Sequence, residues 1–201
     1  MSKIITKTIG ALAVVGLFAT SAYAQGQAAG SPVLARELAP ARGGSSRLLV
    51  TSTAFTSGGL MDDRFTQNGE NMSPPISWNK GPSGTQSYVV IAEDPGVNRP
   101  EPIVHWIIYN IPSTAIRLPG NIPTDATLEN GASQGKNIRG TAGYIGPKPP
   151  AGETHPYVFQ VFALNAKLNL DPANADRNAV INAMKNRVLA SGSFVVNYAG
   201  K

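Results

Sequence analysis

The sequence predicts a mainly β fold with one helix near the C-terminal end. Glycine and proline are enriched, at 21 and 16 of 201 residues, and both favour turns between strands. Charged residues are only 14% of the chain, below the usual value of about a quarter, and the Glu, Lys and Leu mixture of long helices is scarce. The apolar segments are of strand length and rich in β-branched and aromatic residues, and one segment alone has helical periodicity.

The chain begins with a predicted signal peptide, residues 1–24. Lys3 and Lys7 precede an apolar stretch at 9–18, and Ala22-Tyr23-Ala24 is a small-residue cleavage site, so we expect a cut after Ala24. The apolar stretch is shorter than the ~20 residues of a membrane span, and no other segment is long enough for one. We therefore expect a periplasmic or secreted protein.

Residues 25–46 are rich in Gly, Pro, Ala and Ser, which predicts a flexible linker in which VLARELA could form a helical turn. The folded domain is expected at 47–201, a length suited to one domain. The absence of cysteine excludes disulfides, thiolate metal sites and a cysteine nucleophile.

Within this domain, the β-branched and aromatic runs predict six strands and a weak seventh. They are 47–55, 76–78, 87–93, 103–111, 157–164 and 193–198, with the weak one at 116–118. The runs at 87–93 and 103–111 are almost continuously apolar, so we expect a central sheet with both faces covered. The segments 56–75 and 113–143 are punctuated by Gly and Pro and are predicted loops.

The predicted helix covers 176–190, with Asp176 as its N-cap and Gly192 just beyond its end. Its apolar residues recur at helical spacing and are expected to pack into the core: Val180, Ile181, Met184, Val188 and Leu189.

Charge and motifs exclude several functions. The 17 basic residues less the two leader lysines leave 15 against 12 acidic ones, a net charge of +3, with no basic stripe for nucleic acid. Gly135-Lys136 is followed by Asn137 where a phosphate-binding P-loop needs Ser or Thr. Asp62 and Asp63 lack the alternate spacing of a calcium loop.

The candidate site is built from two proline-rich bends that are expected to meet. Asp94 ends one predicted strand, His105 lies in the next, and His155 lies in the bend GPKPPAGETHPY at 146–157, where Lys148 adds positive charge. Prolines flank all three polar residues and restrict the backbone, which favours a preformed ligand pocket. An acidic neighbour would keep an imidazole cationic near neutral pH.

These residues could support three kinds of chemistry. The alternative is that the two histidines are merely packed in loops and have no function. Two imidazoles and a carboxylate can hold zinc or iron, although their spacing is not that of a metal motif. A His–Asp pair could activate Ser73 or Ser77, but no nucleophile elbow is present. Imidazoles, loop N–H groups and a tyrosine hydroxyl can instead bind an anion without chemistry.

Five separated motifs in one order resemble a known family. They are NMSPPISW at 71–78, Asp94-Pro95, His105-Trp106, GYIGPKPPAGETHPYVFQVFAL at 143–164 and VLASGSFVVNY at 188–198. Over 47–199 the chain is similar to the phosphatidylethanolamine-binding protein family, in its bacterial branch of Raf-kinase-inhibitor-like proteins. The resemblance implies a large central antiparallel Greek-key sheet, a smaller sheet and a C-terminal helix. It places a pocket for phosphate- or carboxylate-type anions, such as phospholipid head groups, at one end of the large sheet.

The resemblance also implies a set of ligand-binding residues. They are Asp94, His105, Tyr144, Gly146, Pro149, Pro150, His155 and Tyr157. The chain departs from the family pattern at Gly96, where a second Asp is usual, and at Pro156, where eukaryotic members have Arg.

We therefore expect an exported, non-catalytic binding protein for a small anion or phospholipid head group, with no cofactor, metal, nucleic acid or membrane span. The alternative is an inhibitor of serine proteases, or another interaction protein, that acts through a surface loop such as 113–130. The sequence leaves the oligomeric state open, with a homodimer as one option.

Overall fold

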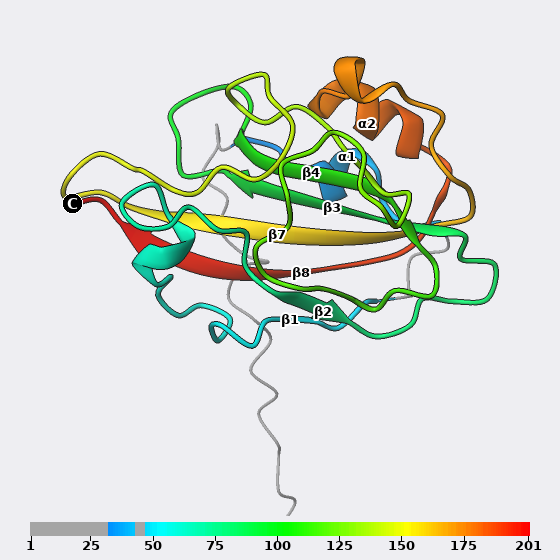
Figure 1. Ribbon diagram of the computed structural model, residues 1–201, viewed down its shortest axis with the longest axis horizontal. Helices are drawn as coiled ribbons and strands as arrows, with labels where there is room; N and C mark the ends of the chain where they lie inside the picture. Colours follow the sequence, from blue (N-terminus) through cyan, green and yellow to red (C-terminus); the bar gives the residue numbers. More distant parts are fainter. Residues whose placement is uncertain (1–31, 43–46) are drawn as a thin grey trace, which may run out of the picture.

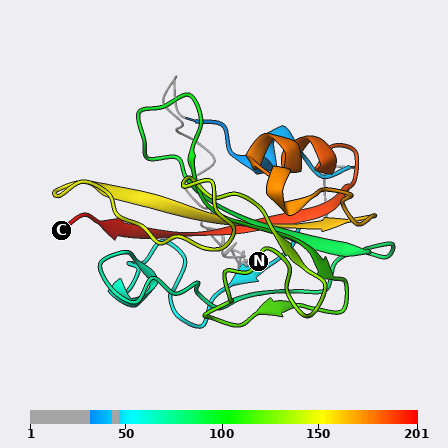
Figure 2. The same ribbon diagram turned by 45° about the horizontal axis from the view of Figure 1, so that its top comes forward.

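Two antiparallel sheets pack face to face, and helices cover the other face of the larger sheet, as Figures 1 and 2 show. This computed structural model describes residues 32–42 and 47–201. The predicted signal peptide and the remaining linker residues, 25–31 and 43–46, lie outside this range. The prediction of a mainly β fold with two antiparallel sheets is confirmed.

The larger sheet has five strands in the order β6-β4-β3-β7-β8, all antiparallel. Their bounds are β3 Ser87–Asp94, β4 Ile103–Pro112, β6 Ser133–Gln134, β7 Thr154–Leu164 and β8 Val188–Ala199. Strands β3, β4 and β6 lie side by side in the order of the chain, and β7 then returns to pair with β3. This is the Greek-key arrangement. β6 lies within a segment that was predicted to be loop.

Strand β3 is buried along its whole length, as its continuous apolar run predicts. Successive side chains alternate between the two faces. Tyr88 and Val90 face the smaller sheet, while Val89 and Ile91 face the helices. The smaller sheet has three short strands, in the order β1 Val50–Thr51, β2 Ile76–Trp78 and β5 Arg117–Leu118. The predicted strand at 47–55 is thus reduced to two residues.

Helix α2 is shorter than predicted and spans Arg177–Met184. Asp176 caps it as expected, because its carboxylate accepts from the Ala179 N–H at 2.8 Å. The helix ends at its C-cap Lys185, whose ψ is 133°, Asn186 follows with φ 62°, and the chain enters β8 at Val188. Gly192 lies inside β8, where a Cβ would be 1.9 Å from the Leu48 carbonyl oxygen. It permits this close backbone crossing, so its reading as a helix stop is wrong.

Residues 32–42, which we name the N-terminal strap, are packed onto the larger sheet beside α2. The strap includes helix α1, Ala35–Leu38, and buries Ala35 and Ala39 among the residues under α2, while Leu34 is also buried. The Ala35 N–H donates to Glu93 Oε2 at 2.9 Å, and Arg177 Nε donates to Glu93 Oε1 at 2.7 Å. The predicted flexible linker is therefore wrong over 32–42, because a buried carboxylate and an apolar layer hold this segment.

No helix within 32–42 and 47–201 combines the length and the apolar character that a membrane crossing requires. Short 3-10 turns at η2, Asp63–Phe65, and η3, Pro172–Asn174, complete the described elements.

We predict that a protein starting at residue 47 is less stable to urea than one starting at residue 32, by about 3 kcal/mol or more. Truncation exposes the surface that Leu34 covers, which costs about 1.5–3 kcal/mol. It also removes a hydrogen bond to the buried Glu93 carboxylate, of similar magnitude. Equal unfolding free energies would show that the strap is not part of the folded unit.

Candidate functional site

Asp94 and His155 meet at one end of the larger sheet. Asp94 ends β3, and His155 is the second residue of the neighbouring strand β7. The His155 Nδ1–H donates to Asp94 Oδ2 at 2.8 Å, and both side chains are buried. The predicted convergence of the two segments is therefore correct, although His155 lies on a strand and not in the bend.

Glu153 holds the other nitrogen of the same ring, with Oε2 at 2.9 Å from His155 Nε2. Because two carboxylates accept from the ring, both nitrogens carry protons in this arrangement. Burial lowers the pKa of His155, but the hydrogen bonds and charges of Asp94 and Glu153 outweigh burial and raise its net pKa above the ordinary value. His155 is thus the histidine of the site whose imidazolium form is favoured.

His105 presents an unsatisfied nitrogen to the same region. Its Nδ1–H donates to the Ile145 carbonyl oxygen at 2.7 Å, and within the described part of the chain Nε2 has no hydrogen-bond partner. The ring packs edge-on against Tyr157, with centroids 5.1 Å apart. Burial lowers the pKa of His105, so the neutral ring has Nε2 as a hydrogen-bond acceptor. His155 therefore acts as a hydrogen-bond donor at both nitrogens, whereas neutral His105 offers an acceptor at Nε2.

A cavity of about 460 Å³ opens beside these side chains. Its walls carry Arg99 and Lys148 as cations and Asp94 and Glu153 as anions. The lining residues are Gln67, Asp94, Gly96, Val97, Asn98, Arg99, Ile103, His105, Ile138, Lys148, Pro149, Pro150, Glu153, His155 and Tyr157. Six of the eight predicted ligand-binding residues thus line one cavity, and Tyr144 and Gly146 do not.

Tyr144 and Gly146 lie behind the wall and support it. The Tyr144 hydroxyl donates to the Phe65 carbonyl oxygen at 2.7 Å, and burial raises its pKa. The Gly146 N–H donates to Asn71 Oδ1 at 2.7 Å, while the Gln67 amide donates to the Gly146 carbonyl oxygen. These bonds hold the loop at 144–150 against the loop that contains η2.

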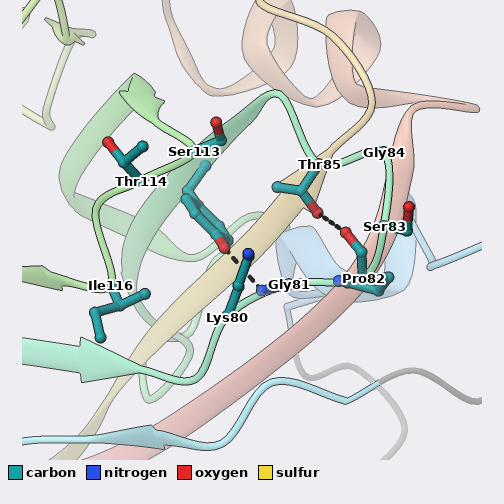
Figure 3. A pocket seen from close by; sticks show the side chains of 10 residues that line it. Lys80, Gly81, Pro82, Ser83, Gly84, Thr85, Ser113, Thr114 and Ile116 are labelled. Atoms are coloured by element: carbon teal, nitrogen blue, oxygen red, sulfur yellow. Dashed lines mark hydrogen bonds between the residues drawn. The ribbon is translucent and has the colours of Figure 1, made fainter.

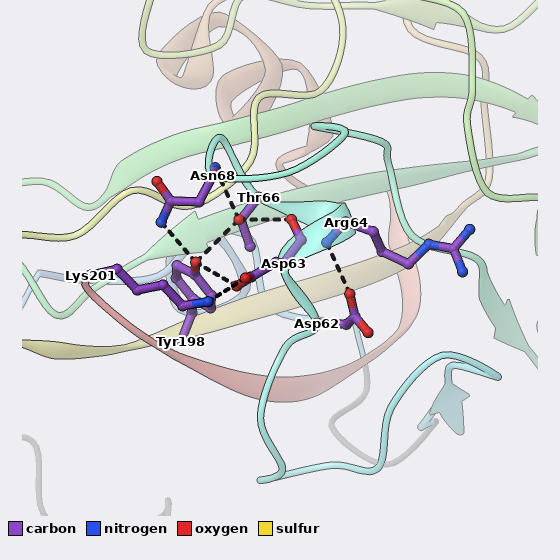
Figure 4. Close-up of polar contacts among 7 residues, drawn as sticks. All are labelled: Asp62, Asp63, Arg64, Thr66, Asn68, Tyr198 and Lys201. Carbon is purple, nitrogen blue, oxygen red and sulfur yellow. Dashed lines mark hydrogen bonds and ion pairs between the residues drawn. The ribbon is translucent and has the colours of Figure 1, made fainter.

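The η2 loop is fixed in turn by the last strand, as Figure 4 shows. The Tyr198 hydroxyl donates to Asp63 Oδ1 at 2.9 Å and accepts from the Asn68 amide at 2.8 Å. Lys201 pairs with the other oxygen of Asp63 and lowers the pKa of that carboxyl. The wall of the cavity therefore rests on β8 through a chain of polar contacts.

Glu153 lines the cavity and contacts His155, but the sequence analysis did not single it out. It precedes His155 by two positions, which places both side chains on the same face of an extended segment. That spacing was a usable signal, but the acid was read as part of a bend. Gln67 comes from a distant loop, and no pattern in the sequence connects it to the site. Arg99 lies in the bend between β3 and β4, but nothing in the sequence marks its side chain as part of the site.

The metal and serine alternatives find no support in this geometry. Within 32–42 and 47–201, no group of three or more His, Asp or Glu side chains is placed to hold a metal ion. Ser73 Oγ accepts from the Ile122 N–H at 2.8 Å, and Ser77 lies on β2 of the smaller sheet. Neither hydroxyl lines the cavity that contains the histidines.

A second hollow, of about 690 Å³, lies where β3 begins, at the other end of that strand (Figure 3). Its residues are Lys80, Gly81, Pro82, Ser83, Gly84, Thr85, Tyr88, Ser113, Thr114 and Ile116. The Tyr88 hydroxyl accepts from the Gly81 N–H, and the Thr85 hydroxyl donates to the Pro82 carbonyl. It contains no histidine or carboxylate, so the histidine cavity is the stronger candidate.

A Greek-key sheet with a polar cavity at its end is the architecture of a β-rich ligand-binding protein. The sequence profile of the phosphatidylethanolamine-binding protein family matches residues 51–199, and the chain belongs to this family. A UPF0098 protein of Methanothermobacter thermautotrophicus is 39% identical over 146 residues, which are 72% of this chain and 94% of that protein. A UPF0098 protein of Aquifex aeolicus is 35% identical over 159 residues, covering 77% and 90%.

Solved structures agree with this assignment. YbcL of Escherichia coli, described as a member of the mammalian family, has a TM-score of 0.72 and 30% identity, covering 78% of this chain and all of that one. A homologue from Chlamydia trachomatis has a TM-score of 0.68 and 28% identity over the same shares. The resemblance drawn from the sequence is therefore confirmed.

The two histidines should titrate on opposite sides of the ordinary value of about 6.5, with His155 above it and His105 below it. NMR of the ring nitrogens measures both, because the chain has only two histidines. A raised folded-state pKa adds stability that is fully present below the unfolded-state pKa of about 6.5. This stability is lost as the pH rises through the folded-state pKa. The stability difference between wild type and His155→Gln should therefore shrink at high pH; a difference that grows with pH contradicts the assignment.

Gly96→Ala should crowd the site, because its Cβ would lie 2.9 Å from the Pro156 ring and 3.1 Å from Asp94 Oδ1. We expect a loss of about 1–3 kcal/mol in unfolding free energy, the usual cost of overpacking. Asn98→Ala, an exposed lining residue of the same loop, is the control and should cost much less. Equal losses in both variants would refute the crowding.

Proposed function

We propose that this protein is an exported binding protein that holds a phosphate- or carboxylate-type group in the histidine cavity, without turnover. The observation that carries this proposal is that one cavity contains both His155, whose imidazolium form is favoured, and the buried, unpartnered Nε2 of His105. A buried polar atom without a partner is rare in a folded protein, and it marks a place where a ligand atom gains a hydrogen bond.

The charges around the cavity support an anion. Arg99, Lys148 and protonated His155 outnumber the Asp94 and Glu153 carboxylates by one, and Asp94 is already paired. Arginine and lysine at a rim attract phosphate and carboxylate groups through charge-assisted hydrogen bonds. The prolines on the same wall restrict the backbone, so little entropy is lost when a ligand binds.

The acceptor role of neutral His105 adds a condition on the ligand. A fully ionised phosphate has no proton to donate to Nε2, so it binds once a proton is added to the ring or to the phosphate. A phosphate monoester, whose second pKa is about 6, supplies this proton readily at slightly acid pH. Binding of the dianion is therefore expected to take up a proton, which calorimetry in buffers of different ionisation enthalpy detects.

Titration calorimetry with inorganic phosphate, O-phosphoethanolamine and acetate tests the proposal. We expect His105→Ala and His155→Ala to weaken binding at least tenfold, which is about 1.4 kcal/mol or more. The first substitution removes the Nε2 atom that would bond to the ligand, and the second removes positive charge from the cavity. Lys148→Ala should weaken binding less, and Lys80→Ala, in the other hollow, should leave it unchanged. Circular dichroism confirms that each variant is folded.

Unchanged affinity in both histidine variants would remove the anion site. The protease-inhibitor alternative would then be tested with a panel of serine proteases, since inhibition through the loop 113–130 would survive these substitutions.

A further inference from the structure

Glu153 combines a fixed backbone with an exposed side chain. Its N–H donates to the Pro150 carbonyl at 3.1 Å, and its own carbonyl accepts from the Gly200 N–H at 2.8 Å. Its side chain nevertheless remains 57% exposed, while that of His155 is 8% exposed. The carboxylate can therefore leave the ring without any change in the fold.

The carboxylate occupies the one ring nitrogen of His155 that a ligand could use. Asp94 holds Nδ1, and Glu153 holds Nε2, so no N–H of this ring remains for an external anion. We propose that Glu153 is an internal anion that occupies the place of the ligand's charged group and is displaced when the ligand binds. This inference rests on the proposed function and assigns the site a built-in competitor.

Displacement concerns Glu153 and not Asp94 because the two contacts differ in burial. Asp94 is 2% exposed, and a buried carboxylate that loses its partner is strongly destabilising. The Glu153 side chain is 57% exposed, so water competes with its contact to His155 and weakens it. A ligand anion thus exchanges a weak internal contact for its own, with help from Arg99 and Lys148 at the same cavity.

Other charged and titratable groups face His155 and remain in place during this exchange. They are Asp94 of β3, His105 of β4, Tyr157 of β7, Tyr198 of β8, and Arg99 and Lys148 of the lining loops. None of these groups holds Nε2, so the state of that nitrogen depends on Glu153.

The chain offers a matched control in Glu101. This exposed acid lies between the lining residues Arg99 and Ile103 but does not line the cavity. Glu101→Gln and Glu153→Gln make the same change in net charge near the site, and only the second removes a contact with His155. A comparison of the two separates displacement from general repulsion.

Calorimetry with inorganic phosphate and with O-phosphoethanolamine should give two- to tenfold tighter binding for Glu153→Gln, and at least as much for Glu153→Ala, which cannot bond to Nε2. Glu101→Gln should change the affinity less than twofold. The gain is expected with both compounds because they share the phosphate group, and the ratio of their affinities distinguishes a free phosphate from a head group.

A crystal grown with phosphate should show a phosphate oxygen at His155 Nε2, with Glu153 turned away. In the ligand-free protein, NMR should show a lower pKa for His155 in Glu153→Gln than in wild type, because a carboxylate that favours the imidazolium is lost.

Three results overturn the proposal. Affinity that is unchanged in both Glu153 variants, or raised equally by Glu101→Gln, rejects the competitor while wild-type binding leaves the anion site intact. Phosphate bound with Glu153 still on Nε2 rejects it in the same way. If wild type and all variants fail to bind phosphate or O-phosphoethanolamine, the proposed function itself fails and the competitor with it.

Discussion

The buried pair of Asp94 and His155 is the interaction on which the candidate site depends. It joins the end of β3 to the start of β7, two strands that pair from Ser87–Leu164 to Glu93–Val158. Asp94 is held from its other side by the Gly96 N–H at 2.7 Å. The carboxylate thus has one orientation, and it determines which nitrogen of His155 faces the cavity. Without this pair, two ionisable groups would be buried at high free-energy cost.

A second buried pair lies one residue away and holds the opposite layer. Glu93 and Asp94 are consecutive, so the pleat of the strand sends their side chains to different surroundings. Glu93 accepts from Arg177 of α2 and from the backbone of the strap, and it also receives the Gln160 amide. The dipeptide at the end of β3 therefore stabilises the helical layer with one carboxylate and the histidine cavity with the other.

The sheet was predictable because its strands have continuous apolar runs, and the histidine cluster was predictable because acid and imidazole residues lie at strand ends beside prolines. The strap was not predictable, since its few apolar residues gain their burial from α2 and from Glu93, which are distant in sequence. The helix was predicted too long because Val188 and Leu189 continue the helical spacing by coincidence, while pairing of Val188 with Leu164 places them in β8. Tyr144 and Gly146 match the family pattern, but their contacts show that they support a wall.

The strap has a consequence for how the chain reaches its native state. The Arg36 guanidinium bonds to Ser193 Oγ, 157 residues further along, and the Arg36 N–H bonds to Gln160, 124 residues along. Contacts of such long range slow folding, because a large loop must close before they form. The partners of the strap come from β3, β7, α2 and β8, so we expect it to dock only after these elements have packed together. A segment that is made early in the chain is thus expected to settle late in folding.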